Sequence, residues 1–258
     1  MRFKEKTVLV TGSSRGIGKQ IALSFAREGA DLIINYVHNQ EPARETAELV
    51  RAMGRRAVVI RANVGKEEAL QKIFAKIKEE YQKLDIFISN AASGFNRPGL
   101  SQKLSGWEHT INVNTRAFLL GTQLAVPLMK NTSGGKIVAI TSPGANRVLP
   151  DYISVGASKA ALNALVRYFA VELAPRNISV NAVAPGIVET DALKHFAFMK
   201  DENVLKNAID QTPAGRLIKP KDVADIVMFL CSPQAEMIRG QVIVVDGGYT
   251  LPVPGYLP

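Results

Sequence analysis

The chain has 258 residues, of which 47% are apolar and 21% are charged, and these are ordinary values for a globular protein. Its single cysteine, Cys231, excludes an internal disulfide, and the three histidines form no cluster with metal-ligand spacing. Residues 1–6 are charged, and the apolar run that follows extends only from Val8 to Val10. We therefore expect no metal, no secretory signal, no membrane span and a cytoplasmic location.

The net charge of +9 raises the question of an anionic partner. The sequence contains no block of five or six basic residues and no aromatic residues interleaved with basic ones. Nucleic-acid binding is therefore not expected. The charge is equally compatible with an acidic partner protein and with no binding role at all.

Short apolar runs alternate with longer helical patterns along the whole chain. In chain order we predict strand Thr7–Thr11, helix Arg15–Glu28, strand Asp31–Tyr36, helix Gln40–Met53, strand Ala57–Ile60, helix Lys66–Tyr81, strand Asp85–Ile88, helix Trp107–Met129, strand Lys136–Ile140, helix Val155–Ala174, strand Ile178–Val183, helix Lys221–Leu230 and strand Gln241–Val245.

The predicted strands are continuously apolar, which is typical of strands that are buried on both faces of a parallel sheet. Their alternation with helices predicts an α/β fold, a single-domain doubly wound parallel sheet of the Rossmann type with helices on both faces. No linker or repeat divides residues 1–258. The widest irregular region is 187–220, which we predict to be a lid over the substrate.

The first predicted strand runs directly into a glycine-rich turn that opens a helix. Glycines let backbone N–H groups approach a phosphate, and the N-terminus of the helix favours negative charge. The spacing T-G-x-x-x-G-x-G differs from the general dinucleotide fingerprint, but its place after the first parallel strand predicts cofactor binding. The predicted binding residues are Gly12, Ser13, Ser14, Arg15, Gly16, Ile17 and Gly18.

With this spacing the chain resembles the short-chain dehydrogenase/reductase family along essentially its whole length. Ser89-Asn90-Ala91-Ala92 resembles the N-N-A-G turn of the family, Asn114 matches its helix-borne asparagine, Ser142 its catalytic serine, and Pro185-Gly186 the turn beside the nicotinamide. The resemblance implies catalytic roles for Asn114 and Ser142, and a homotetramer. It also implies cofactor contacts from Asn63, Val64, Asn90, Ala91, Ala92, Pro185, Gly186 and Ile187.

The end of the second predicted strand bears on the choice of cofactor. An NAD site places a carboxylate there, on the ribose 2′-hydroxyl, whereas this strand ends Ile34-Asn35-Tyr36-Val37-His38 without an acid. Arg15, inside the glycine turn, can reach toward a 2′-phosphate with its planar set of donors. We therefore predict NADPH.

The catalytic tyrosine is displaced from its usual place in the family, Tyr-x-x-x-Lys on one helix. Val155 stands four residues before Lys159, and Tyr152 stands seven before it. Both spacings keep the two side chains on one helical face, but the longer one moves the tyrosine by roughly 4.5 Å along the axis. A 2-enoyl thioester accepts hydride at C3 while negative charge develops on the oxygen at C1, so the displacement favours an enoyl thioester over a ketone.

Tyr-x6-Lys is also typical of the enoyl-thioester reductases of bacterial fatty-acid synthesis, and the chain resembles their NADPH-dependent type III group from bacilli. This resemblance implies that Lys159 holds the nicotinamide ribose and lowers the pKa of Tyr152. It implies a thioester of acyl carrier protein or coenzyme A as substrate, with Phe95 and Phe196 lining an acyl groove. A 3-oxoacyl or other carbonyl reductase and a non-catalytic NADPH-binding sensor or scaffold remain as alternatives.

Overall fold

The computed structural model describes residues 1–130, 132, 134–190, 193 and 202–252. Its centre is a seven-stranded sheet with the order β3-β2-β1-β4-β5-β6-β7, in which every pair of neighbours is parallel. The strands are β1 (Thr7–Val10), β2 (Asp31–Tyr36), β3 (Ala57–Arg61), β4 (Ile86–Ser89), β5 (Gly135–Ile140), β6 (Ile178–Pro185) and β7 (Val242–Val245). The direction of winding reverses between β1 and β4, where folds of this type bind ligands.

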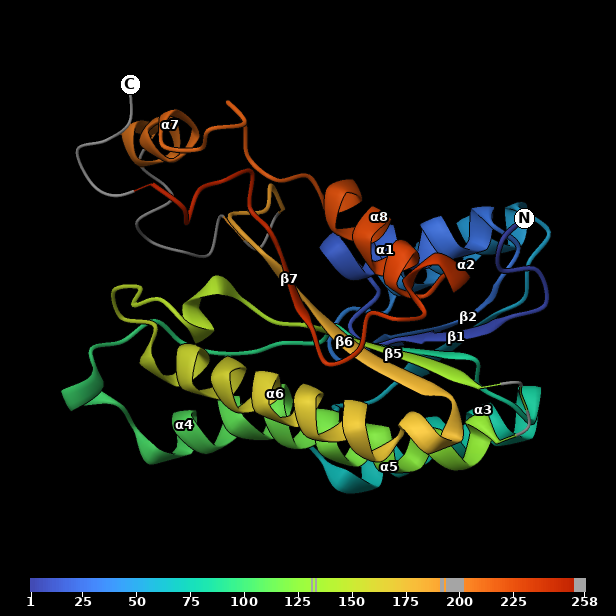
Figure 1. Cartoon of the computed structure of the whole chain (residues 1–258). Helices are drawn as coiled ribbons and strands as arrows, with labels where there is room; N and C mark the ends of the chain where they lie inside the picture. The colour runs from blue at the N-terminus through green and yellow to red at the C-terminus, as the bar shows by residue number, and fades with distance from the viewer. Residues whose placement is uncertain (131, 133, 191–192, 194–201, 253–258) are drawn as a thin grey trace.

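Helices cover both faces of the sheet (Figure 1). The first face carries α1 (Gly16–Arg27), α2 (Glu41–Ala52) and α8 (Pro220–Leu230). The second face carries α3 (Glu67–Tyr81), α5 (Ala117–Met129) and α6 (Ile153–Glu172). The predicted α/β class, the single doubly wound sheet and the layering are therefore confirmed.

Two predicted element assignments are wrong in detail. The helix predicted over Trp107–Met129 begins earlier, as α4 (Leu104–Ile111), and is divided from α5 by a π-helical turn at Asn112–Arg116. The region 187–220 is not wholly irregular, because it contains α7 (Glu202–Asp210). Apolar periodicity carries no signal for a π turn, and α7 is too short and polar to stand out from its surroundings.

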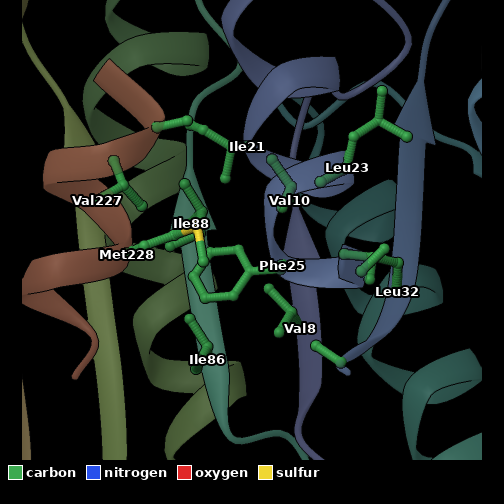
Figure 2. Close-up of a cluster of buried hydrophobic side chains, with 14 of the residues drawn as sticks. Val8, Val10, Ile21, Leu23, Phe25, Leu32, Ile86, Ile88, Val227 and Met228 are labelled. Atoms are coloured by element: carbon green, nitrogen blue, oxygen red, sulfur yellow. The ribbon is translucent and has the colours of Figure 1, made fainter. Parts of the chain in front are cut away.

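Each face of the sheet has its own apolar core. On the first face the ring of Phe25 lies among side chains of α8 and of the central strands (Figure 2). Phe25 is fully buried and meets Phe3 edge-on, with 4.8 Å between the ring centroids. The core extends to Cys231, which is buried, and burial raises the pKa of its thiol, as expected of a structural cysteine. Among the described residues, no helix is long and apolar enough to cross a bilayer.

Candidate active site

The glycine turn between β1 and α1 has the conformation that a phosphate-binding turn needs. Gly12 and Gly16 have φ values of +64° and +55°, in the left-handed region that favours glycine. A β-carbon on Gly18 would lie 2.4 Å from the carbonyl oxygen of Gly12 and 2.5 Å from the amide nitrogen of Asn90. The turn is thus closed so tightly that only glycine fits at position 18.

Asn35, the penultimate residue of β2, braces this turn, a role that is not predicted from the sequence. Its Oδ1 accepts a hydrogen bond from the Gly12 N–H at 3.1 Å, and its Nδ2 donates to the carbonyl of Ala62 at 3.0 Å. Its own backbone N–H and carbonyl bond Ser13. The signal available in the sequence was an asparagine directly after the apolar run Leu32–Ile34, because a polar side chain in a buried strand must find partners.

The predicted turn after β4 lies against the glycine turn. The Thr11 hydroxyl accepts the backbone N–H groups of Asn90 and Ala91, each at 3.0 Å. The side-chain amide of Asn90 donates to the Thr11 carbonyl at 2.8 Å. The structure therefore brings together the two cofactor segments predicted on either side of the switch point, Gly12–Gly18 and Asn90–Ala92.

The remaining predicted cofactor residues lie at the same carboxyl-terminal edge. Val64 is buried, and Asn63 caps its own turn by accepting the Gly65 N–H at 3.0 Å. Gly186 donates to the Val245 carbonyl at 2.9 Å, and a β-carbon there would lie 2.8 Å from that of Asp246. Pro185 ends β6, and the carbonyl of Ile187 accepts the N–H of Ile218.

Arg15 is exposed at the first turn of α1. Within the described part of the chain its guanidinium has no hydrogen-bond or ion-pair partner. A free planar cation beside a left-handed glycine turn and a helix N-terminus fits a dinucleotide phosphate in both shape and charge. The residues at this edge therefore suit a nicotinamide dinucleotide.

Tyr152 does not belong to the helix that carries Lys159. It precedes α6 as its N-cap residue, with φ −103° and ψ 10°. Its hydroxyl donates a long hydrogen bond of 3.4 Å to Oγ of Ser142, which also accepts the N–H of Gly144 at 3.1 Å. The structure thus brings two of the predicted catalytic side chains together, and Ser142 also caps the short turn that follows β5.

Lys159 is buried, and its Nζ donates to the carbonyl of Ile140 at 2.7 Å. Burial lowers the pKa of Lys159 from 10.5 to about 8. The pKa of Tyr152 is raised by burial, which the hydrogen bond with Ser142 only partly offsets. The expected lowering of the tyrosine pKa by Lys159 is therefore wrong for this structure, because desolvation of the phenol dominates.

Asn114 lies in the π-helical turn and is buried. Its Oδ1 accepts the Ser93 N–H at 2.9 Å, and its Nδ2 donates to the Ser93 carbonyl and to Oγ of Ser158, both at 2.9 Å. The side chain thus ties the segment after β4 to α6, one residue before Lys159. Neither Ser93 nor Ser158 was singled out from the sequence, because contacts across such separations leave no local pattern.

Of the two predicted substrate-binding phenylalanines, the structure describes only Phe95. Phe95 is 58% exposed and its ring lies 6.4 Å from that of His109. Phe196 lies outside the described residues, as does part of the predicted lid over 187–220. Phe95 is thus exposed, two residues after Ser93, which Asn114 anchors.

Comparison with known proteins identifies the class. Residues 12–250 match the family model described as enoyl-(acyl carrier protein) reductase. The chain is 36% identical over 253 residues to 1-cyclohexenylcarbonyl-CoA reductase of Streptomyces collinus, covering 98% of this chain and 90% of that protein. It is 33% identical to the 7alpha-hydroxysteroid dehydrogenase of Escherichia coli K12, covering 96% and 95%.

Comparison with solved structures indicates the same class of protein. A 7alpha-hydroxysteroid dehydrogenase in complex with NADH and 7-oxo glycochenodeoxycholic acid superposes with a TM-score of 0.91 at 33% identity, covering 96% of this chain and 95% of that one. A short-chain dehydrogenase from Burkholderia cenocepacia in complex with NADP gives 0.88 at 32% identity, covering 96% and 99%. The chain therefore belongs to the short-chain dehydrogenase/reductase family of oxidoreductases.

Proposed function

We propose that this protein uses NADPH to reduce trans-2-enoyl thioesters, carried on acyl carrier protein or coenzyme A. The observation that carries the proposal is the position of Tyr152 outside α6, with Val155 at the place four residues before Lys159. The matched family model and the acyl-CoA reductase among the relatives support a thioester substrate.

The proposed mechanism assigns one task to each side chain. NADPH, when bound, would supply the hydride that C3 of the enoyl group accepts, and the resulting enolate would take a proton from water at C2. The raised pKa of Tyr152 keeps its hydroxyl protonated at neutral pH, so that it can exchange its long hydrogen bond to Ser142 for one donated to the oxygen on which negative charge develops. The Ser142 hydroxyl would then donate to Oη of Tyr152 and orient it, and Lys159 would hold the hydroxyls of the nicotinamide ribose.

The choice of NADPH rests on the guanidinium of Arg15, which has no partner among the described residues, and on the strand end Ile34–His38, which offers no acid to repel a 2′-phosphate. Losing a charge-assisted hydrogen bond costs about 1.5–3 kcal/mol, or roughly a ten- to hundredfold weaker binding. Arg15→Ala should therefore raise the KM for NADPH by that factor and leave the KM for NADH nearly unchanged. Arg27→Ala, at the other end of α1, is the matched control, and equal effects on both cofactors would refute the assignment.

The test of the reaction compares crotonyl and acetoacetyl thioesters by NADPH oxidation. We expect the crotonyl thioester to have the higher kcat/KM, and Tyr152→Phe to lower kcat by roughly 10²–10⁴-fold. Tyr168→Phe, an exposed tyrosine on α6, controls for the loss of a hydroxyl. A higher kcat/KM for the acetoacetyl thioester would refute the proposal.

A carbonyl reductase is the second candidate. It is favoured by the hydrogen bond between Tyr152 and Ser142, a pair that can polarise a ketone, and by the hydroxysteroid dehydrogenase among the relatives. The same assay decides between the two, because a carbonyl reductase turns over the acetoacetyl thioester faster. A protein that binds NADPH and reduces neither substrate would fit the sensor alternative.

A further inference from the structure

The segment Ser93–Gly99, which we call the clasp, runs along the segment that bears Tyr152. Near its start, a β-carbon built on Gly94 would lie 2.2 Å from Cγ2 of Val155. Further along, the N–H of Arg97 donates to the carbonyl of Asp151 at 2.8 Å. At its end, a β-carbon on Gly99 would lie 3.1 Å from Cδ1 of Ile153. The clasp thus touches the chain on both sides of Tyr152.

The clasp is itself fixed to the framework of the site. Asn114 bonds both the N–H and the carbonyl of Ser93, and the same amide bonds Ser158 in α6. The hydroxyl of Ser93 is engaged too, at 3.0 Å from Nε2 of His109 in α4. The anchored end therefore cannot shift without breaking the two part-buried hydrogen bonds between Ser93 and Asn114, so the residues next to Ser93 are held in place against Val155.

The segment that the clasp touches holds a strained conformation. Asp151 has φ +58°, in the left-handed region that a non-glycine residue rarely adopts. Tyr152 follows it as the N-cap of α6, outside the helical repeat. Such a conformation persists only where surrounding contacts determine it, and the hydrogen bond from Arg97 is received by the strained residue itself.

We propose that the clasp is a positioning element that fixes Tyr152 at its displaced place, with Gly94 and Val155 as a size-matched pair, and so selects enoyl over ketone substrates. The selectivity part rests on the proposed function. Val155 is buried against the Gly94 backbone. The position four residues before Lys159 therefore holds a side chain that fixes the position of the clasp by direct contact.

Gly94→Ala tests the pair. The added methyl group must push the clasp away from the first turn of α6, and a displacement of about 1 Å in a catalytic group costs up to roughly 10²-fold in rate. We expect kcat for the crotonyl thioester to fall at least about tenfold, the crotonyl-to-acetoacetyl ratio to fall with it, and the KM for NADPH to stay unchanged. Val155→Ile, which enlarges the other partner, should act in the same direction.

Rescue separates positioning from a general loss of structure. Adding Val155→Ala to Gly94→Ala restores the space and should return both kcat and the substrate ratio toward wild type. Gly106→Ala in α4 is the matched control, since its β-carbon would meet only Phe95 at an ordinary 3.8 Å. An unchanged ratio in the folded Gly94→Ala and Val155→Ile proteins, or a loss that Val155→Ala fails to rescue, overturns the proposal.

A second readout does not depend on the reaction. The absorbance of the phenolate, titrated with pH and referred to the Tyr152→Phe protein, reports the surroundings of Tyr152. Displacement by Gly94→Ala should expose the phenol and lower its pKa, and Val155→Ala should reverse this change. If wild type reduces neither thioester, the proposed function fails, and this titration decides the positioning role alone: an unmoved titration overturns it.

Discussion

The burial of Lys159 makes the free energy of unfolding of the protein depend on pH. Its pKa is lowered from 10.5 to about 8 because the ammonium group loses its hydration. Between those pH values the unfolded chain binds more protons at this lysine than the folded protein does. The contribution of Lys159 to the free energy of unfolding therefore rises with pH across this window, and below pH 8 the whole cost of burying the charge is present.

The size of the effect follows from the gap between the two pKa values. At about 1.4 kcal/mol for each unit, the buried charge costs about 3–4 kcal/mol at neutral pH. Lys159→Met removes that cost and keeps the length of the side chain, but it leaves the Ile140 carbonyl without its donor, which costs about 1 kcal/mol. We expect the variant to be about 2–3 kcal/mol more stable than wild type at pH 7.

Urea denaturation at pH values from 7 to 10 measures this difference. The advantage of Lys159→Met should shrink steadily above pH 8 and vanish near pH 10, while its enzymatic activity is lost throughout. Lys72→Met, at an exposed lysine of α3, should keep the pH dependence of wild type. A Lys159→Met protein that is less stable than wild type at pH 7, or a difference that does not change with pH, would refute the reasoning.

Three further expectations follow from the glycine turn, the core and the family resemblance. Gly18→Ala should weaken NADPH binding at least about tenfold in a fluorescence titration, because its β-carbon overlaps the Gly12 carbonyl; near-normal binding would contradict the closed turn. Phe25→Ala should lower the free energy of unfolding by about 3–5 kcal/mol, and a loss below about 1 kcal/mol would contradict its burial. In light scattering we expect about four times 28.0 kDa, and a monomer mass would exclude the proposed tetramer.

The fold was predictable because its signals are local. The strand Asp31–Tyr36 has the predicted bounds, and Ile178–Pro185 extends the prediction by two residues. Continuous apolar runs specify buried strands, and the alternation with helices then leaves few topologies to consider. The glycine turn was predictable for the same reason, since the chemistry of a phosphate site lies within a few consecutive residues.

The geometry around Tyr152 was not predictable to the same degree. The spacing to Lys159 located the tyrosine, and the predicted helix start at Val155 left it outside the helix, but neither indicated its bond to Ser142 or that burial raises its pKa. The bond between Asn114 and Ser93, and the contact of Gly94 with Val155, join residues far apart in the sequence. Such pairs depend on how loops pack once the sheet has formed, and nothing in the local pattern of either partner specifies the other.

The π-helical turn at Asn112–Arg116 fixes the number of residues that the chain needs between α4 and α5. Its hydrogen bonds span five residues, so it holds about one residue more than an α-helical turn, and each residue of a helix accounts for about 100° of rotation. The extra residue lets α4 and α5 face different neighbours while Asn114 points to Ser93 and Ser158. Deleting one residue here would make α4 and α5 one continuous α-helix and turn the Asn114 side chain away from Ser93 and Ser158. The number of residues in this turn therefore matters as much as which residues they are.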